Sequence, residues 1–264
     1  MKIEIELAAP PPMDFLPENI PLKVVFEDDR LMVIDKPAGM VVHPAAGNYE
    51  GTLVNALLHH LGESPKSNLD PGRLGLVHRL DKDTSGLLVV AKDEMSLATL
   101  QKQLKERKIK RVYTAIVWGR MEKQKGTIDL PIGRSEKDRK IMSVNPRHGR
   151  QAVTHYDVAQ RFELADKLVV TLGTGRTHQI RVHLSYFGHP VIGDATYGGR
   201  AKYLKRLNKS DLKIAMPVLQ LITRQALHAT ILEFPHPETG EFLKFESQLP
   251  DDIISVLSYL RSLA

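Results

Sequence analysis

A polar turn that runs directly into an apolar strand constrains this chain more than any other segment. The turn is HRLDKDTSG at residues 78–86, and the apolar run Leu87–Ala91 follows it at once. Such a strand anchors the turn rigidly and places one aspartate, Asp81, beside an arginine and a histidine. Because an opposite charge favours the anion, an arginine can hold this carboxylate ionised. Asp81 is therefore a candidate catalyst, a candidate metal ligand or one half of a buried ion pair.

The order of the other elements predicts an α+β fold. Period-two alternation indicates strands, and apolar residues at helical spacing indicate helices. The strand-like segments are residues 23–27, 31–36, 87–92, 112–119, 152–159, 167–172, 226–234 and 241–246. The helical segments are residues 52–60, 93–111, 178–187 and a last one from 250 onward, with Asp93 as the expected N-cap of the second. Because strands and helices do not alternate regularly, we expect a largely antiparallel sheet.

The charge balance favours a polyanionic partner. The chain has 37 lysines and arginines against 31 aspartates and glutamates, which gives a formal net charge of +6 at pH 7. This surplus fits a nucleic-acid-binding protein, although it can also serve solubility alone.

Composition and hydropathy point to the cytoplasm. The chain has no cysteine, which excludes disulfides and thiolate metal sites and fits a reducing cytosol. Apolar runs fall well short of the ~20 residues that span a membrane. The N-terminal MKIEIEL alternates charged and apolar residues, unlike the apolar region of a signal peptide. We therefore expect a cytoplasmic protein without a membrane partner.

Two kinds of metal chemistry can be tested against the turn. Asp81, Asp83, Ser85 and Gly86 fit the first, third, fifth and sixth places of an EF-hand loop, but Lys92 holds the twelfth, where a bidentate glutamate is required. Calcium binding is therefore excluded. A D-x-D-x-T phosphoryl-transfer site with Mg²⁺ stays open, although its nucleophile should end a buried strand and here the strong strand comes after the motif.

Glycosidic-bond chemistry on a nucleotide is the third alternative. A single carboxylate can attack a sugar or remove a proton beside an oxocarbenium-like centre. An aspartate paired with arginine suits the role of nucleophile or base and not that of an acid. A zinc site at His178 and His183 is not favoured, because the two are five residues apart and no third ligand is evident.

Six segments, in the same order along the chain, resemble the motifs of the RluA-type pseudouridine synthases. They are KPAGMVVHP (36–44), HRLDKDTSG (78–86), RVYTA (111–115), TGRTHQIRVH (174–183), GDATYGG (193–199) and RQALHA (224–229). The resemblance extends from about residue 22 to 248. Within that family, the chain is most similar to the group that modifies large-subunit ribosomal RNA, the synthase D type.

The resemblance implies a pseudouridine synthase fold, with an active-site cleft across the sheet, and a reaction without cofactor or metal. The family breaks the N1–C1′ bond of a uridine in RNA, rotates the uracil and rejoins it through C5. By the same resemblance, Asp81 is the catalytic aspartate, acting as nucleophile or as base. Tyr113 lies against the uracil, and Arg181 pairs with Asp81. An RNA-binding protein with an inactive synthase fold is the alternative from another class.

The resemblance also implies an RNA partner, 23S ribosomal RNA or a pre-ribosomal particle, with tRNA as the alternative and the protein as a monomer. Since the target base must leave its helix, Arg79 is the candidate to brace the gap. Residues 134–150 correspond to a mobile, finger-like loop that grips RNA in this family. The residues expected to contact RNA are Arg79, Lys82, Arg107, Lys108, Arg139, Lys140, Arg176, His178 and Gln179.

The first residues differ in character from the rest of the chain. Residues 1–7 alternate like a strand, and a proline-rich linker follows up to residue 21. A lone strand has no pairing partner, and relatives of the synthase D type carry a small S4-like RNA-binding domain at this end. We therefore expect residues 1–21 to be the remnant of a missing S4-like domain and residues 22–264 to be the catalytic domain.

Overall fold

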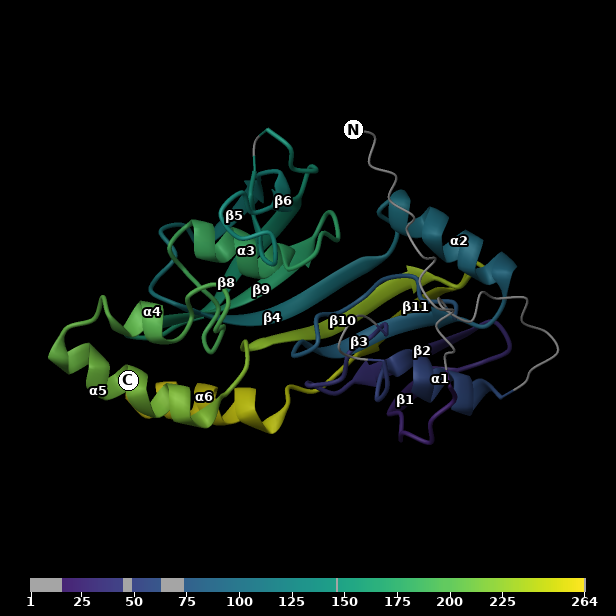
Figure 1. The fold of residues 1–264 in the computed structure, drawn as a ribbon, viewed down its shortest axis with the longest axis horizontal. Helices are drawn as coiled ribbons and strands as arrows, with labels where there is room; N and C mark the ends of the chain where they lie inside the picture. The colour runs from purple at the N-terminus through teal and green to yellow at the C-terminus, as the bar shows by residue number, and fades with distance from the viewer. Residues whose placement is uncertain (1–15, 45–48, 63–73, 146, 264) are drawn as a thin grey trace, which may run out of the picture.

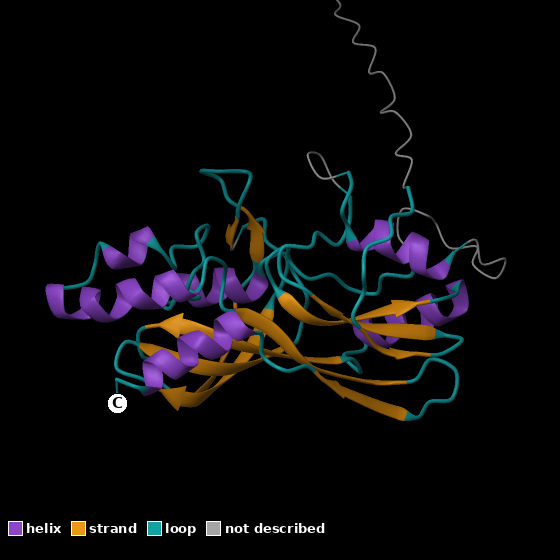
Figure 2. Ribbon diagram, turned by 90° about the horizontal axis from the view of Figure 1, so that it is seen from below, coloured by secondary structure: helices purple, strands orange, loops and turns teal. Residues whose placement is uncertain are grey.

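The computed structural model describes residues 16–44, 49–62, 74–145 and 147–263. In this part of the chain a long sheet carries helices against it (Figures 1 and 2). Its strands are β1 (Val24–Glu27), β2 (Leu31–Lys36), β3 (Ser85–Ala91), β4 (Lys110–Trp118), β5 (Lys125–Asp129), β8 (Val153–Arg161), β9 (Ala165–Leu172), β10 (Leu227–Pro235) and β11 (Phe242–Glu246). A separate pair consists of β6 (Ile132–Arg134) and β7 (Met142–Val144). The helices are α1 (Leu53–Leu61), α2 (Glu94–Lys105), α3 (Gln179–Tyr186), α4 (Ala201–Leu204), α5 (Lys209–Leu221) and α6 (Asp251–Arg261).

The main sheet consists of two half-sheets that meet along β10. The strand order is β1-β2-β3-β10-β4-β9-β8-β5, and β11 also pairs with β10. Neighbouring strands are antiparallel, except that β3 and β10 run parallel. β3 pairs with β10 only through Ser85 and Gly86, and β11 takes its place along residues 231–235. The predicted α+β fold with a largely antiparallel sheet is confirmed.

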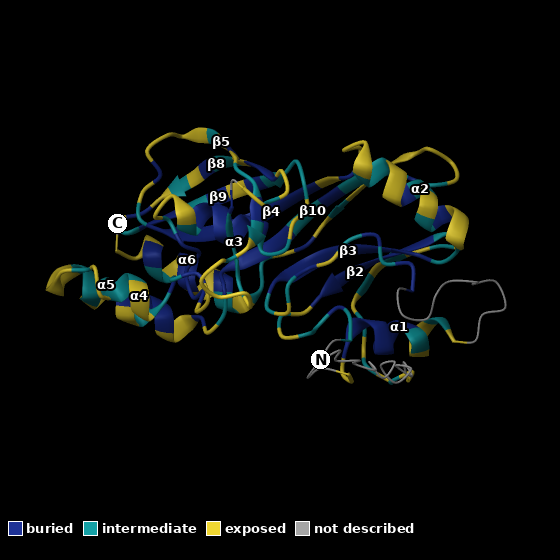
Figure 3. Cartoon of the chain, turned by 45° about the horizontal axis from the view of Figure 1, so that its top comes forward, coloured by how far each residue is buried: buried dark blue, intermediate teal, exposed yellow. Residues whose placement is uncertain are grey.

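Strands β2 and β3 are buried on both faces. Because successive side chains of a strand point to opposite faces, their apolar residues divide between two cores. Leu31 and Val33 pack in a core that includes Leu100 of α2, whereas Met32 and Ile34 pack in the larger core that includes α1. Figure 3 shows these strands as buried and the outer face of α2 as exposed. This burial on both sides holds β3, and with it the preceding turn, in a fixed position.

The helix predicted from Asp93 to about Arg111 ends earlier than expected. Its start is correct, because the Asp93 carboxylate accepts a backbone N–H of the first turn at 2.8 Å. α2 nevertheless ends at Lys105, since Arg107 adopts a left-handed φ of 61° and turns the chain toward β4. Ile109 is buried as expected, but it lies in the connection between α2 and β4. Arg111 lies in β4.

The polar segment 134–150 is more ordered than a loop. It contains β7, which pairs with β6 in an antiparallel hairpin. Ile132 at the start of this hairpin is buried against Val182 and Tyr197, with Val144 packed beside them. These few apolar side chains, spread through a polar stretch, form no periodic pattern in the sequence. The hairpin is therefore fixed by tertiary contacts with α3 and its neighbourhood.

Three further points concern the helices and the N-terminus. No sequence pattern predicted α5, which contains Pro217, a residue that normally argues against a helix interior. None of the helices in the described ranges is long and apolar enough to cross a membrane. The strand predicted for residues 1–7 lies outside the described residues.

Gly86 allows β3 to approach β10 closely. Its φ is +111°, and a Cβ atom there would lie 2.2 Å from the backbone oxygen of Ala229. We expect Gly86→Ala to lower the free energy of unfolding by roughly 3 kcal/mol or more, because both the backbone conformation and the strand contact are lost. Urea denaturation measures this change.

Gly240→Ala is the matched control for this variant. Gly240 also has a positive φ, +74°, but nothing lies within 4 Å of the position of a Cβ atom. Its free energy of unfolding should therefore fall by only about 1–2 kcal/mol, the cost of a positive φ at alanine. Equal losses in the two variants would show that the contact between β3 and β10 is not tight.

Candidate active site

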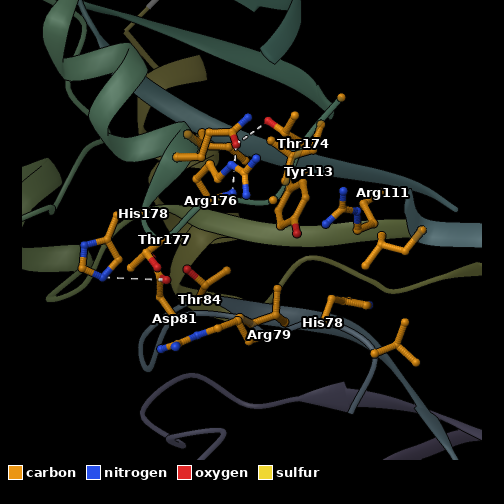
Figure 4. Close-up of a pocket in the computed structure, with 18 of the residues that line it drawn as sticks. His78, Arg79, Asp81, Thr84, Arg111, Tyr113, Thr174, Arg176, Thr177 and His178 are labelled. Atoms are coloured by element: carbon orange, nitrogen blue, oxygen red, sulfur yellow. Dashed lines mark hydrogen bonds and ion pairs between the residues drawn. The ribbon is translucent and has the colours of Figure 1, made fainter. Parts of the chain in front are cut away.

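A cavity of about 530 Å³ lies where the two half-sheets meet. Its volume falls within the ~300–1,000 Å³ of ordinary ligand sites. Its wall combines the turn before β3, the start of β4 and the connection from β9 to α3 (Figure 4). The predicted site residues that line it are Asp81, Tyr113, Arg181, Arg79, Arg107, Arg176, His178 and Gln179. The predicted RNA contacts Lys82, Lys108, Arg139 and Lys140 are not part of this wall.

The turn that carries Asp81 is held from two sides. On one side, the Gly39 N–H donates to the Lys82 carbonyl at 3.0 Å. On the other, the Arg224 guanidinium donates to the Asp83 carbonyl at 2.9 Å, and the Ser85 hydroxyl lies 2.9 Å from Nδ1 of His228. The turn is therefore held by its backbone and by neighbouring side chains, without use of the Asp81 carboxylate.

Lys36 connects this turn to the preceding loop. Its side chain is fully buried, and Nζ donates to the carbonyls of Pro37, Met40 and Lys82 at 2.8–2.9 Å. Burial lowers the pKa of the Lys36 ammonium to about 7, although the carboxylates of Asp83 and Asp81 oppose this shift. Lys36 therefore supports the turn from inside the protein, in a position that composition alone would assign to the surface.

Arg181 is shared between two carboxylates. Its Nη1 donates to Oδ2 of Asp81 at 3.0 Å, while Nε and Nη2 donate to the two oxygens of Asp194 at 2.7 and 3.0 Å. Burial opposes the charge of this guanidinium, but the hydrogen bonds and charges of Asp194 and Asp81 outweigh burial and raise the pKa of Arg181. The bidentate bond with Asp194 fixes the plane of the guanidinium, so that Nη1 points at Asp81.

His178 contacts the other oxygen of Asp81. Nε2 lies 3.8 Å from Oδ1 of Asp81, and Nδ1 lies 2.7 Å from the Tyr197 hydroxyl. That hydroxyl accepts the backbone N–H of Met142 in β7 at 3.0 Å, so it can give its own proton to Nδ1. Burial lowers the pKa of His178, with Asp81 opposing. Nε2, on the other side of the ring, faces the aspartate.

Tyr113 provides an aromatic wall. It is the fourth residue of β4, and its side chain lies on the same face of the strand as that of Arg111, two residues before. Only 5% of Tyr113 is exposed, and Figure 4 shows the ring projecting into the cavity across from Asp81 and Arg79. Burial raises the pKa of the Tyr113 hydroxyl, so this group stays protonated near neutral pH.

The predicted RNA contacts fall in different environments. Arg79 is exposed at the cavity beside Asp81. Arg139 and Lys140 are exposed in the connection between β6 and β7, and Lys108 forms a surface ion pair with Glu106 at 2.8 Å. Lys82 is also exposed, outside the cavity.

Gln179 has a different environment from the other predicted contacts. It is 3% exposed, and its carbonyl oxygen accepts from the Thr174 hydroxyl and the Arg176 N–H. Its amide nitrogen donates to the Val153 carbonyl and to the Thr154 hydroxyl. With all four hydrogen bonds made inside the protein, Gln179 is better suited to shaping the 174–178 loop than to contacting RNA.

His183 has the structural environment that its spacing suggested. Nδ1 lies 2.9 Å from the Thr154 hydroxyl and Nε2 lies 3.0 Å from the Leu130 carbonyl, so both ring nitrogens are occupied. Among the described residues, no group of three or more His, Asp or Glu side chains is arranged to hold a metal ion.

Three functional neighbours were missed from the sequence. Asp194 and Tyr197 lie in the GDATYGG segment, which signalled the region but not their contacts with Arg181 and His178. Lys36 lies in KPAGMVVHP, where nothing local signals a buried lysine. The motifs contain all three residues, but their burial and their partners depend on segments far apart in the sequence.

Comparisons with known proteins identify the family of the chain. Residues 30–186 match a family described as RNA pseudouridylate synthase. The chain is 47% identical, over 98% of its length and 80% of the relative's, to an uncharacterized RNA pseudouridine synthase of Chlorobaculum parvum. It is 50% identical to the ribosomal large subunit pseudouridine synthase D of Nitrosomonas europaea, covering 93% of this chain and 67% of the relative.

A solved structure shares the fold as well. The human RNA pseudouridylate synthase domain containing 4 superposes with a TM-score of 0.69 at 28% identity, covering 90% of this chain and 92% of that one.

The lowered pKa of Lys36 makes stability depend on pH. Between about pH 7 and the ordinary lysine pKa of 10.5, the unfolded chain binds a proton at Lys36 that the folded chain has lost. Stability from this group therefore rises with pH across that window, by up to about 1.4 kcal/mol per pH unit. We expect Lys36→Met to lack this rise when urea denaturation is repeated at each pH.

Lys82→Met is the control, since Lys82 belongs to the same turn but is exposed. Its free energy of unfolding should follow the pH dependence of the wild type. Parallel curves for wild type and Lys36→Met would contradict the assignment of a buried, partly neutral Lys36.

Proposed function

Since the chain belongs to the RNA pseudouridylate synthase family, we propose that it converts uridine to pseudouridine in large-subunit ribosomal RNA, with Asp81 as the catalytic carboxylate. Family membership makes it an RNA pseudouridine synthase, an isomerase. The observation that carries the catalytic assignment is the Asp81 carboxylate in the cavity, 3.0 Å from a guanidinium that is itself fixed by Asp194.

The reaction needs one ionised carboxylate beside the ribose. The N1–C1′ bond of uridine breaks, a C5–C1′ bond forms, the proton on C5 leaves, and N1 carries a proton in the product. Asp81 acts as nucleophile at C1′ or as base at the ribose, and both roles require the anion. Arg181 donates to the Asp81 carboxylate at 3.0 Å and orients it.

Tyr113 keeps the detached uracil in place. Between bond breaking and bond formation the base is held by no covalent bond, so it must be retained while it rotates. A flat, buried phenol ring across from Asp81 offers a stacking surface without a fixed hydrogen-bond direction. We infer that Tyr113 stacks on the uracil, in either of its orientations.

Access to the cavity requires that the target base leaves its helix, which costs a few kcal/mol of stacking. Arg79 is exposed at the cavity, next to Asp81 in the turn. Its long cationic side chain is suited to filling the gap in the helix and to contacting the backbone phosphates. We infer that Arg79 braces the opened strand.

Large-subunit ribosomal RNA is the proposed substrate because similar relatives are named for it. The exposed cations of the β6–β7 hairpin and of the residues after α2 would contact its phosphates. We also propose that residues 22–264 act as the catalytic domain, in the cytoplasm, as a monomer and without a cofactor.

Asp81→Asn tests the catalytic assignment. The amide can neither attack C1′ nor accept a proton, so pseudouridine formation should fall by roughly 10³-fold or more. The fold should persist, because Arg181 keeps its two hydrogen bonds to Asp194. Product is measured by tritium release from C5-labelled RNA, with RNA affinity and thermal unfolding measured alongside.

Asp83→Asn is the matched control, two residues further along the same turn. It should keep activity within roughly 10-fold of the wild type, because its side chain lies outside the cavity wall. Activity of the wild type should also survive EDTA. Wild-type product from Asp81→Asn would refute the role of Asp81, and Mg²⁺-dependent phosphate release without tritium release would favour the phosphoryl-transfer alternative.

Mapping in a deletion strain tests the proposed substrate. Pseudouridines that disappear from large-subunit RNA, and return with wild-type protein but not with Asp81→Asn, are the expected result. Loss confined to tRNA would contradict the ribosomal assignment while leaving the isomerase activity intact.

A further inference from the structure

Arg111 is a buried cation without a partner among the described residues. It is 7% exposed, close to the 6% of Arg181, yet within the described ranges neither a hydrogen bond nor an ion pair holds its side chain. Its Nε atom is buried and lacks an acceptor. Because a buried charge is costly unless it is paired, this guanidinium is set up for an anion that arrives from outside.

The surroundings of Arg111 in the cavity wall suit such an anion. At the same end of the cavity, Nδ1 of His78 is also buried without a hydrogen-bond partner (Figure 4). A Cβ atom at Gly175 would lie 2.6 Å from Nη1 of Arg111, so a glycine at this position lets the guanidinium lie against the 174–178 loop. Asp81 is the one carboxylate among the described residues of the wall, and it is paired with Arg181.

We propose that Arg111 binds a backbone phosphate of the RNA strand, so that the cavity takes a nucleotide together with its phosphate and not a base alone. A phosphate offers two oxygens in the geometry that a guanidinium binds bidentately, and it neutralises the buried charge. His78 Nδ1 lies at the same end of the cavity as a second, neutral contact. This proposal rests on the proposed function and names the part of the substrate that is held.

A phosphate ligand also suits the reaction better than the uracil does. The uracil has to detach and rotate, so any strong bond between Arg111 and a uracil oxygen would have to break during the reaction. The phosphate does not move relative to the ribose in this way. Binding through the phosphate therefore holds C1′ against Asp81 while Tyr113 lets the base turn.

The stability of the free protein separates this role from a structural one. If Arg111 served the fold, removing it would lower the melting temperature. Because its charge is unpaired in the free protein, Arg111→Gln should melt at the same temperature as the wild type or higher. Arg111→Met is a second variant that removes the charge and keeps most of the aliphatic stem.

Binding is tested with pentauridylate in which one phosphate at a time is replaced by an uncharged methylphosphonate. By fluorescence anisotropy, we expect neutralisation at one position to weaken wild-type binding roughly 10- to 100-fold and to leave the affinity of Arg111→Gln unchanged. The slope of log Kd against log salt should also decrease by about one in the variant. Arg107→Gln, an exposed cation of the same cavity, should keep the position-specific loss.

Three results would overturn the proposal: additive losses in the variant and the modified RNA, a lower melting temperature in both Arg111 variants, or no binding of pentauridylate by the wild type. Reduced turnover of Arg111→Gln at unchanged RNA affinity would assign Arg111 to the uracil instead. Because these readouts need no product, a protein that forms no pseudouridine but shows the position-specific loss would refute the proposed function and keep the phosphate site.

Discussion

The contact between β3 and β10 determines how the parts of the site meet. Asp81 lies just before β3 in one half-sheet, whereas Tyr113 and Arg181 come from β4 and α3 on the other side of β10. The two strands pair at only two positions, where Gly86 lets their backbones approach. A small shift at this contact would move the carboxylate away from its guanidinium. The geometry of the site therefore depends on main-chain packing as much as on the catalytic side chains.

Two buried arginines give the cavity opposite kinds of ends. The charge of Arg181 is balanced by Asp81 and Asp194, so this end of the cavity has no unpaired positive charge before a ligand binds. Arg111 is uncompensated, which leaves the other end short of negative charge. An arrangement of this kind lowers the stability of the free protein in favour of a ligand, as functional sites often do. The charge pattern thus distinguishes the two ends of the cavity. The catalytic Asp81 lies at one end, and the proposed phosphate-binding Arg111 lies at the other.

Local patterns were enough to predict much of the fold and of the site. The turn at Asp81 and the strand after it were predictable because a polar motif beside a continuous apolar run is a short-range signal. The end of α2 was not, since it depends on a left-handed conformation of Arg107, which propensity disfavours. Gln179 was expected to face RNA, but its amide is used inside the protein. The burial of Lys36 and the missing partner of Arg111 are properties of the three-dimensional neighbourhood, which sequence motifs do not encode.

The reactivity of an amine usually depends on its pKa and on its accessibility to reagents, and at Lys36 these two properties have opposite effects. A pKa of about 7 makes much of this amine neutral, and so nucleophilic, near neutral pH, but the side chain is fully buried. Acylating reagents therefore react with the exposed lysines first and reach Lys36 only when the surrounding structure opens. The rate of acylation at Lys36 would report how often the turn that carries Asp81 comes apart, in a protein that has not turned over any RNA.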